Sequence, residues 1–82
     1  MTTVTLYGRK DCCLCDDARD VLKRAQATHA FVLEELDIET DERLLRTYLE
    51  KIPVVAIDGV ERFELIVDAT ELKRLLCRVQ VQ

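Results

Sequence analysis

The chain has 82 residues and a formal net charge of −4 at pH 7. This length fits one domain near the lower end of the sizes that fold on a hydrophobic core alone. The acidic balance, with an isoelectric point of about 4.9, excludes the basic stripe that would neutralise nucleic-acid or membrane phosphates. No secretory signal is expected, and no apolar run reaches the ~20 residues of a membrane helix. We therefore expect a single cytoplasmic domain, residues 1–82, with no nucleic-acid or membrane partner.

The N-terminal third of the chain predicts a strand followed by a helix. Residues 3–7, TVTLY, are β-branched and aromatic, which favours a strand. From Leu14 onward, apolar residues recur at the spacing of one helix face. Asp11 is the expected N-cap of this helix, because its carboxylate can accept hydrogen bonds from the first backbone N–H groups. The apolar positions are Leu14, Ala18, Val21, Leu22 and Ala25.

The middle of the chain predicts a second strand and a short helix. Residues 31–38, FVLEELDI, combine an apolar run with alternation, as a strand does. Thr40 is the expected cap of a helix over residues 41–50, which Pro53 ends because the residue before a proline avoids helical backbone. The residues expected to face inward from this helix are Leu44, Leu45, Tyr48 and Leu49.

The C-terminal third predicts a hairpin and a last helix. The buried strand VVAI, residues 54–57, and the return strand VERFEL, residues 60–65, flank Asp58-Gly59, which is a strong turn signal. Asp68 begins a D-x-x-E pattern that resembles a capping box. The apolar stripe of the helix that follows is Leu72, Leu75, Leu76 and Val79.

The elements follow the order β-α-β-α-β-β-α, which predicts an α/β fold. A β-α-β opening implies that the first two strands are parallel and joined by a right-handed crossover. The last two strands must form an antiparallel hairpin. Because the strands contain apolar runs, we expect a sheet covered on both faces. The expected architecture is a four-stranded mixed sheet flanked by three helices.

Three of the four cysteines lie within RKDCCLCDD, residues 9–17, at the start of the first predicted helix. Residues three apart share a helix face, so Cys12 and Cys15 can approach one another, whereas Cys13 is rotated about 100° away. The free N–H groups and the dipole of a helix start favour the thiolate form of Cys12. We therefore expect Cys12 to be the redox nucleophile and Cys15, one turn further, to be the resolving thiol.

Two other interpretations of the cysteines remain open. A C-x-x-C pair can be half of a metal site, but the remaining ligand candidates, His29 and Cys77, have no recognisable ligand spacing, and no metal is expected. A free cysteine can also be a small buried hydrophobe. Cys13 is expected to be a bystander on the rim of the site. Cys77 is assigned no role, and His29 is expected to be solvated.

The cysteine turn together with Ile52-Pro53-Val54 resembles the glutaredoxin-like family of the thioredoxin-fold superfamily, over nearly all 82 residues. It is similar to short bacterial glutaredoxin-like proteins that begin TLY-x-R-x-x-C-x-L-C-D. The resemblance implies a thioredoxin-like fold and a cis-proline at Pro53 that faces the active site. It also implies that Ile52 binds substrate through a free backbone N–H and C=O, as an added strand does, and that Arg9 meets a glutathione carboxylate.

Two features of the chain depart from the glutaredoxin pattern. Cys13 and Leu14 stand between the cysteines where glutaredoxins usually have proline and tyrosine. Residues 61–70, ERFELIVDAT, contain no glycine pair to cradle a glutathione carboxylate, and they contain acidic Glu64 and Asp68. Like charges repel, so this surface disfavours glutathione as a co-substrate. No cofactor is expected.

These observations together favour a cytoplasmic thiol–disulfide oxidoreductase with a role in cell redox homeostasis. Its expected substrate is a disulfide-containing protein or a small thiol, and its electron donor is glutathione or a thioredoxin-reductase-type protein. One alternative is a non-catalytic interaction module on the same fold, which uses the groove around Ile52 and Pro53. The other is a metal or iron–sulfur carrier that uses Cys12, Cys13 and Cys15.

Overall fold

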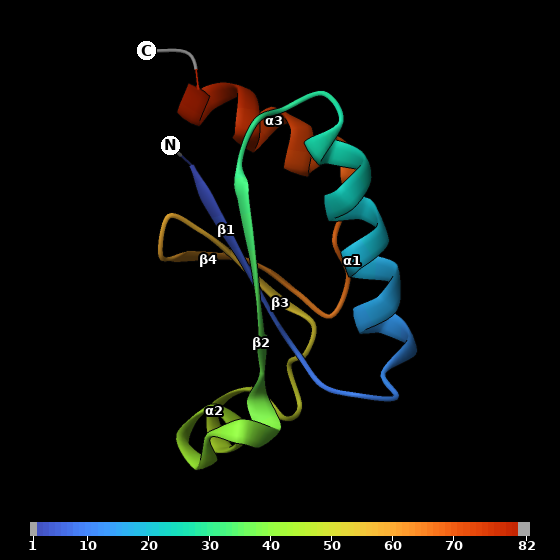
Figure 1. The fold of residues 1–82 in the computed structure, drawn as a ribbon, viewed down its shortest axis with the longest axis vertical. Coiled ribbons are helices and arrows are strands. Elements are labelled where there is room, and N and C mark those ends of the chain that lie inside the picture. Colours follow the sequence, from blue (N-terminus) through green and yellow to red (C-terminus); the bar gives the residue numbers. More distant parts are fainter. Residues whose placement is uncertain (1, 81–82) are drawn as a thin grey trace.

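Residues 2–80, which the computed structural model describes, form four strands, three α-helices and one 3-10 turn (Figure 1). Their order is the one predicted from the sequence. The bounds are β1 Thr3–Gly8, α1 Cys13–Gln26, β2 Val32–Asp37, η1 Ile38–Thr40, α2 Glu42–Tyr48, β3 Val54–Ile57, β4 Val60–Glu64 and α3 Ala69–Gln80.

The four strands form one mixed sheet in the order β2-β1-β3-β4. Strands β1 and β2 are parallel, with Thr3 opposite Val32, and β3 is antiparallel to both β1 and β4. Asp58 and Gly59 join β3 to β4 with φ angles of 49° and 84°, which is the left-handed backbone that a two-residue hairpin turn needs. The predictions of the mixed sheet and of this hairpin are confirmed.

Helix α1 begins after Cys12, so the expectation that Asp11 is its N-cap is wrong. Asp11 has a φ of 58°, a left-handed turn conformation that aspartate tolerates. Cys12 is the N-cap instead, and its sulfur accepts a hydrogen bond from the Cys15 backbone N–H at 3.2 Å. The buried face of the helix also differs from the predicted one, because Leu14 is 46% exposed and Cys15 is buried in its place.

Helices α1 and α3 pack against the sheet, with α3 crossing near the C-terminal end of α1 (Figure 1), and they enclose the larger of two hydrophobic clusters, which we call the main core. Its fully buried members come from the sheet as well as from both helices. A buried cluster of this kind is the main favourable contribution to the folding of a small domain. The main core consists of Val4, Leu6, Ala18, Leu22, Ala25, Phe31, Val55, Ile57, Phe63, Val67, Leu72 and Leu76.

Helix α2 lies near the opposite end of the molecule from α3 (Figure 1) and covers a smaller cluster. Its N-cap is Asp41, whose carboxylate accepts from the Arg43 N–H at 2.8 Å. Thr40 belongs instead to η1, so the prediction of Thr40 as the cap is wrong, as is the inward position of Leu49, which is 44% exposed. We call the smaller cluster the site cluster. It consists of buried Cys15, Ile38 and Ile52, with Tyr7, Cys12, Leu44, Leu45 and Tyr48 packed against them.

Helix α3 begins where the D-x-x-E pattern predicted. The Asp68 carboxylate accepts hydrogen bonds from the backbone N–H groups of Thr70 and Glu71 at 2.8 and 3.2 Å. Leu72 and Leu76 are fully buried. The side chain of Val79, the last predicted member of the stripe, lies outside the described residues.

The two edge strands are less covered than expected. Strand β2 contains no buried residue, and β4 buries Phe63 alone. The expectation of a sheet covered on both faces is therefore wrong at its edges, where charged side chains alternate with the apolar ones that suggested burial. Within residues 2–80, none of the helices is long and apolar enough to cross a membrane.

Candidate active site

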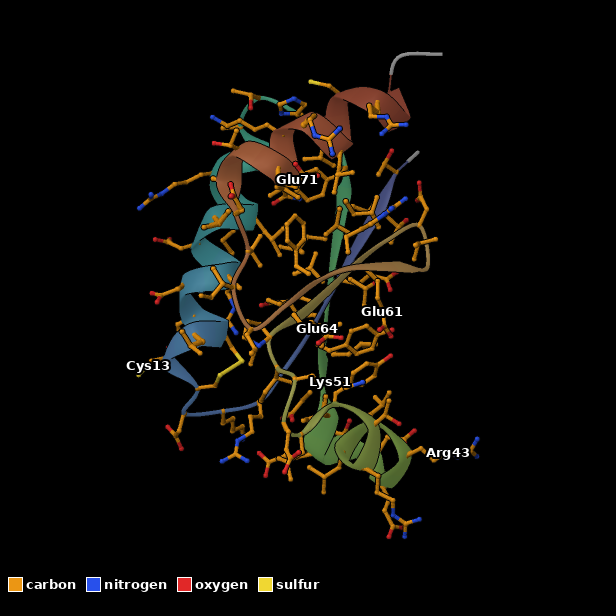
Figure 2. The ribbon with its side chains drawn as sticks, turned by 180° about the vertical axis from the view of Figure 1, so that it is seen from behind. Cys13, Arg43, Lys51, Glu61, Glu64 and Glu71 are labelled. Carbon is orange, nitrogen blue, oxygen red and sulfur yellow. A yellow bond between two sulfur atoms is a disulfide. The ribbon has the colours of Figure 1, made fainter. Side chains whose placement is uncertain are left out.

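Cys12 and Cys15 are joined by a disulfide at the start of α1, drawn as the yellow bond in Figure 2. Their Cα atoms lie 5.2 Å apart, because the first turn of the helix places residues three apart on one side. Cys15 is fully buried, whereas Cys12 is half-buried. An incoming disulfide can therefore reach the Cys12 sulfur more easily than the Cys15 sulfur.

The start of α1 provides Cys12 with a hydrogen-bond donor and a favourable dipole. The backbone N–H of Cys15 points to the Cys12 sulfur, and the first N–H groups of a helix lack intrahelical partners. Both effects stabilise negative charge on a sulfur at this position.

Acidic Asp16 lies in the same first turn and opposes this effect, but it is paired. Arg19 binds Asp16 at 2.8 Å and also binds Glu35 of β2. The hydrogen bond with Glu35, followed by that with Asp16, raises the pKa of Arg19. The guanidinium thus offsets part of the negative charge beside the cysteines and connects α1 to the edge of the sheet.

Gly8 lets the chain pass close to the buried cysteine, which sequence reasoning missed. A Cβ atom at this position would lie 3.1 Å from the sulfur and 3.3 Å from the Cβ of Cys15. Such contacts are tighter than ordinary van der Waals packing. The sequence did contain a signal for this close approach. The chain has only two glycines, and one of them directly precedes the cysteine turn.

The Ile52–Pro53 loop lies in the site cluster with the two cysteines. The Ile52–Pro53 peptide bond is cis, and both side chains are buried. The backbone N–H of Ile52 donates to the Tyr48 carbonyl at 3.0 Å. The expectation of a free N–H at Ile52 is therefore wrong, because the C-terminus of α2 already uses it. Among residues 2–80, no donor binds the Ile52 carbonyl oxygen.

Arg9 lies outside the site cluster that contains Ile52. It is exposed and lines a groove of about 490 Å³ between α1 and the ends of β1 and β2. The groove mixes charges of both signs, and Arg9 forms no ion pair with the described residues. Of the site residues predicted from the sequence, the structure thus places Cys12, Cys15 and Ile52 in the site cluster and leaves Arg9 outside it. The lining of the Arg9 groove comprises Leu6, Gly8, Arg9, Lys10, Asp11, Asp16, Arg19, Glu35, Leu36 and Asp37.

An apolar surface, not recognised in the sequence, lies beside the start of α1. Leu14, Leu65 and Ile66 are 46%, 47% and 72% exposed, and together they line a groove of about 230 Å³ with Asp17. The backbone N–H of Leu65 donates to the Lys51 and Pro53 carbonyls, which connects this surface to the cis-proline loop. Figure 2 shows Glu64 and Lys51 on the segments that meet there.

A tyrosine pair packs against the site cluster. The rings of Tyr7 and Tyr48 stack with centroids 4.6 Å apart. The Tyr48 hydroxyl donates to the Glu61 carboxylate of β4 at 2.6 Å. This hydrogen bond, together with burial and the nearby negative charge, raises the pKa of Tyr48 to about 12. The pair joins α2 to the sheet.

The two remaining cysteines are free and exposed. Cys13 lies at the outer side of α1 (Figure 2). His29 is half-buried, and its Nε2 atom lies 3.3 Å from the Cys77 sulfur. His29 is therefore less exposed than the expected solvated residue. Within residues 2–80, no three histidine, cysteine or acidic side chains gather as metal ligands would.

Comparisons with known proteins agree with this geometry. A family model described as Glutaredoxin-like domain (DUF836) matches residues 3–77. The chain is similar to the solved structures of protein Ne2328 from Nitrosomonas europaea (27% identity, TM-score 0.79, covering 92% of this chain and 91% of that one) and of target protein XcR50 from X. campestris (31% identity, TM-score 0.77, covering 92% and 96%). No curated protein matches.

A thioredoxin from Halobacterium salinarum is more distant in sequence but similar in structure. It is 18% identical, with a TM-score of 0.69, and the match covers 92% of this chain and 71% of that one. Together with the sheet order and the three helices, this likeness establishes the thioredoxin-like fold predicted above. The chain has a thioredoxin-like fold and belongs to the family whose model is described as Glutaredoxin-like domain (DUF836).

Proposed function

We propose that the protein is a cytoplasmic thiol–disulfide oxidoreductase in which Cys12 attacks and Cys15 resolves. The observation that carries the proposal is the Cys12–Cys15 pair at the start of α1, with the first cysteine accessible and the second fully buried. Several cysteines clustered on one turn are typical of catalytic chemistry in a reducing compartment.

The proposed reaction reduces a substrate disulfide at the expense of the cysteine pair. The Cys12 thiolate attacks one substrate sulfur, a Cys12–substrate disulfide forms, and the other substrate sulfur leaves as a thiolate that takes up a proton. Cys15 then loses its proton and attacks the Cys12 sulfur. The Cys12–Cys15 disulfide forms, and the second substrate sulfur leaves as a thiol. Two electrons have passed from the protein to the substrate.

The surroundings of Cys12 support a protein disulfide as the substrate. Leu14, Leu65 and Ile66 offer exposed apolar area next to the cysteine turn, and apolar contacts suit a peptide chain better than a small anionic thiol. The open Ile52 carbonyl can accept one hydrogen bond from an extended peptide backbone. Pro53 and Arg9 remain proposed substrate contacts.

Glutathione is the less favoured substrate and donor. Leu65 and Ile66 occupy the segment where glutaredoxins carry a glycine pair, and exposed Glu64 and Asp68 flank it. A glutathione carboxylate placed there would meet like charge. We therefore propose a thioredoxin-reductase-type donor ahead of glutathione.

The proposal is tested by the catalysed reduction of insulin disulfides with dithiothreitol as the reductant. Cys12→Ser is expected to abolish catalysis. Cys15→Ser is expected to accumulate a mixed disulfide on Cys12, which mass spectrometry detects. Cys13→Ser, which changes an exposed neighbour of the pair, is the matched control and should keep the wild-type rate.

Two outcomes would overturn parts of this assignment. Full turnover by Cys12→Ser would show that another residue is the nucleophile. No catalysis by the wild type, with partner binding that Cys15→Ser leaves unchanged, would favour a non-catalytic interaction module.

A further inference from the structure

A second thiol, Cys77, lies far from the cysteine pair and has a histidine partner. It belongs to α3, and the His29 Nε2 atom lies 3.3 Å from its sulfur, although the two residues are 48 positions apart. His29 follows the C-terminal end of α1, and the cysteine pair lies at the N-terminal end of the same helix. The helix has 14 residues and is therefore roughly 20 Å long. Figure 2 shows this separation between Cys13, at the start of α1, and Glu71 of α3.

A third side chain fixes the orientation of the imidazole. The Thr28 hydroxyl lies 3.3 Å from the Ala25 carbonyl, to which it can only donate, and 3.0 Å from the His29 Nδ1 atom. In the tautomer with a proton on Nδ1, the Thr28 hydroxyl accepts from Nδ1–H and donates its own proton to the Ala25 carbonyl. The Nε2 atom is then unprotonated and accepts from the Cys77 thiol. A nucleophile, a base and a group that orients the base are the arrangement that activates thiols in general.

A groove with cationic side chains adjoins this pair. It has a volume of about 240 Å³, lies between α1 and α3, and is lined by Thr28, Arg24 and Lys73 among others. Lys73 and Cys77 are four residues apart on α3 and are both exposed, so they share one helix face. Arg24 pairs with Asp20, but Lys73 forms no ion pair with the described residues. Lys73 therefore places positive charge on the helix face that carries Cys77, and this charge favours an anionic group near the sulfur.

We infer that Cys77 is a second, independent thiol-modification site, which takes up low-molecular-weight disulfides that carry carboxylates. His29 Nε2 accepts the Cys77 proton, and the sulfur attacks one sulfur of the disulfide. A Cys77 mixed disulfide forms, the bond within the reagent breaks, and the leaving thiolate takes the proton from His29. Cys77 is oxidised and half of the reagent is reduced, so no further oxidant is needed.

The other free cysteine provides an internal control. Cys13 is also exposed, but no hydrogen bond to its thiol is found among residues 2–80. Asp17, which forms no ion pair with another residue of the range 2–80, lies four residues later on α1, on the same face as Cys13. An anionic reagent therefore meets like charge at Cys13 and opposite charge at Cys77.

The test uses the full chain with its Cys12–Cys15 disulfide closed and glutathione disulfide as the probe. Peptide mapping by mass spectrometry gives the rates of adduct formation at Cys77 and Cys13 in the same sample. We expect Cys77 to react at least about tenfold faster. With cystamine, a cationic disulfide, the ratio of the Cys77 rate to the Cys13 rate should fall. Equal rates at the two cysteines with glutathione disulfide would overturn the proposal.

Two variants separate the roles of the base and the charge. His29→Gln can still hydrogen-bond but cannot take up the thiol proton, and it should slow Cys77 with both probes. Lys73→Gln, an exposed change that does not touch the core, should slow Cys77 with glutathione disulfide only. Insulin reduction by both variants should match the wild type. An unchanged Cys77 rate in His29→Gln would show that His29 is a structural neighbour and would overturn the mechanism.

Discussion

The main core and the site cluster are built from different parts of the fold and contain different kinds of side chain. The main core joins the sheet to two long helices and contains apolar side chains alone. The site cluster has three buried members, one of which is the redox-paired Cys15, and its cover is the short helix α2. Residues that stabilise the fold are thus largely separate from residues that hold the disulfide.

Under the proposed function, this difference would let a chain of 82 residues open and close a disulfide without losing its fold. Opening the Cys12–Cys15 bond alters packing in the site cluster, where Cys12 already lies half-buried. The main core, further along the same buried face of α1, keeps its contacts. Local changes of this kind leave the global free energy of unfolding largely intact when the regions share few partners.

The largest effect on stability is expected for Leu22→Ala in the main core. Leu22 is fully buried, so its truncation should lower the free energy of unfolding by about 2–5 kcal/mol. Urea unfolding monitored by circular dichroism measures this loss. The redox equilibrium of the Cys12–Cys15 pair, measured on the folded protein in dithiothreitol buffers, should not move.

The matched control for this prediction is Leu49→Ala. Leu49 is 44% exposed, and its truncation should change stability by no more than about 0.5 kcal/mol. A shift of the redox equilibrium in Leu22→Ala would mean that the two clusters are coupled, which would contradict the comparison.

A smaller loss of stability, with a change in redox behaviour, is expected for Gly8→Ala. The new methyl group would lie 3.1 Å from the Cys15 sulfur, and overpacking of this kind costs about 1–3 kcal/mol. Because the displaced atom belongs to the disulfide, the Cys12–Cys15 equilibrium should shift toward the dithiol. Mass spectrometry after alkylation in redox buffers measures the shift.

The second glycine of the chain supplies the control. Gly59 has a φ of 84° and open space around its Cα, so Gly59→Ala should lose about 1–2 kcal/mol through backbone strain alone. It should leave the redox equilibrium unchanged. Equal redox shifts in the two variants would show that lost stability, rather than contact with Cys15, causes the change.

The sequence predicted the order of elements because each element carries its own periodicity and its own end signals. The Asp58-Gly59 turn and the Asp68 cap are local features, and both were confirmed. The pairing of Cys12 with Cys15 was also local, since one helical turn determines it.

The features that were missed depend on contacts between distant residues or on a choice between similar neighbours. Asp11 and Cys12 can both cap a helix, and only the left-handed backbone of Asp11 decides between them. The bond from the Ile52 N–H to Tyr48 depends on where α2 ends. Cys77 and His29 are brought together by the packing of α3 beside α1, which no spacing in the sequence encodes.

The smallest effect is expected at Tyr48, which joins the site cluster to β4. Its hydrogen bond to Glu61 raises its pKa from 10.0 to about 12. As the pH rises, Tyr48 loses its proton in the unfolded chain before it does so in the folded protein. Its contribution to the free energy of unfolding is therefore fully present below pH 10 and is lost as the pH rises toward about 12. Tyr48→Phe should lower the free energy of unfolding by about 1 kcal/mol at pH 8. This difference between the variant and the wild type should disappear between pH 10 and about 12.

Urea unfolding of the wild type and Tyr48→Phe at pH 8, 10 and 11.5 tests this prediction, because titrations common to both proteins cancel in the difference. Glu61→Gln keeps an acceptor for the hydroxyl but removes the charge. In this variant, the pH range over which the stabilisation by Tyr48 is lost should therefore narrow toward pH 10. No difference between wild type and Tyr48→Phe at any of these pH values would show that the ring, which stacks on Tyr7 and which Phe keeps, rather than the bond to Glu61, is what Tyr48 contributes. The site cluster would then be held by apolar contacts alone, as the main core is.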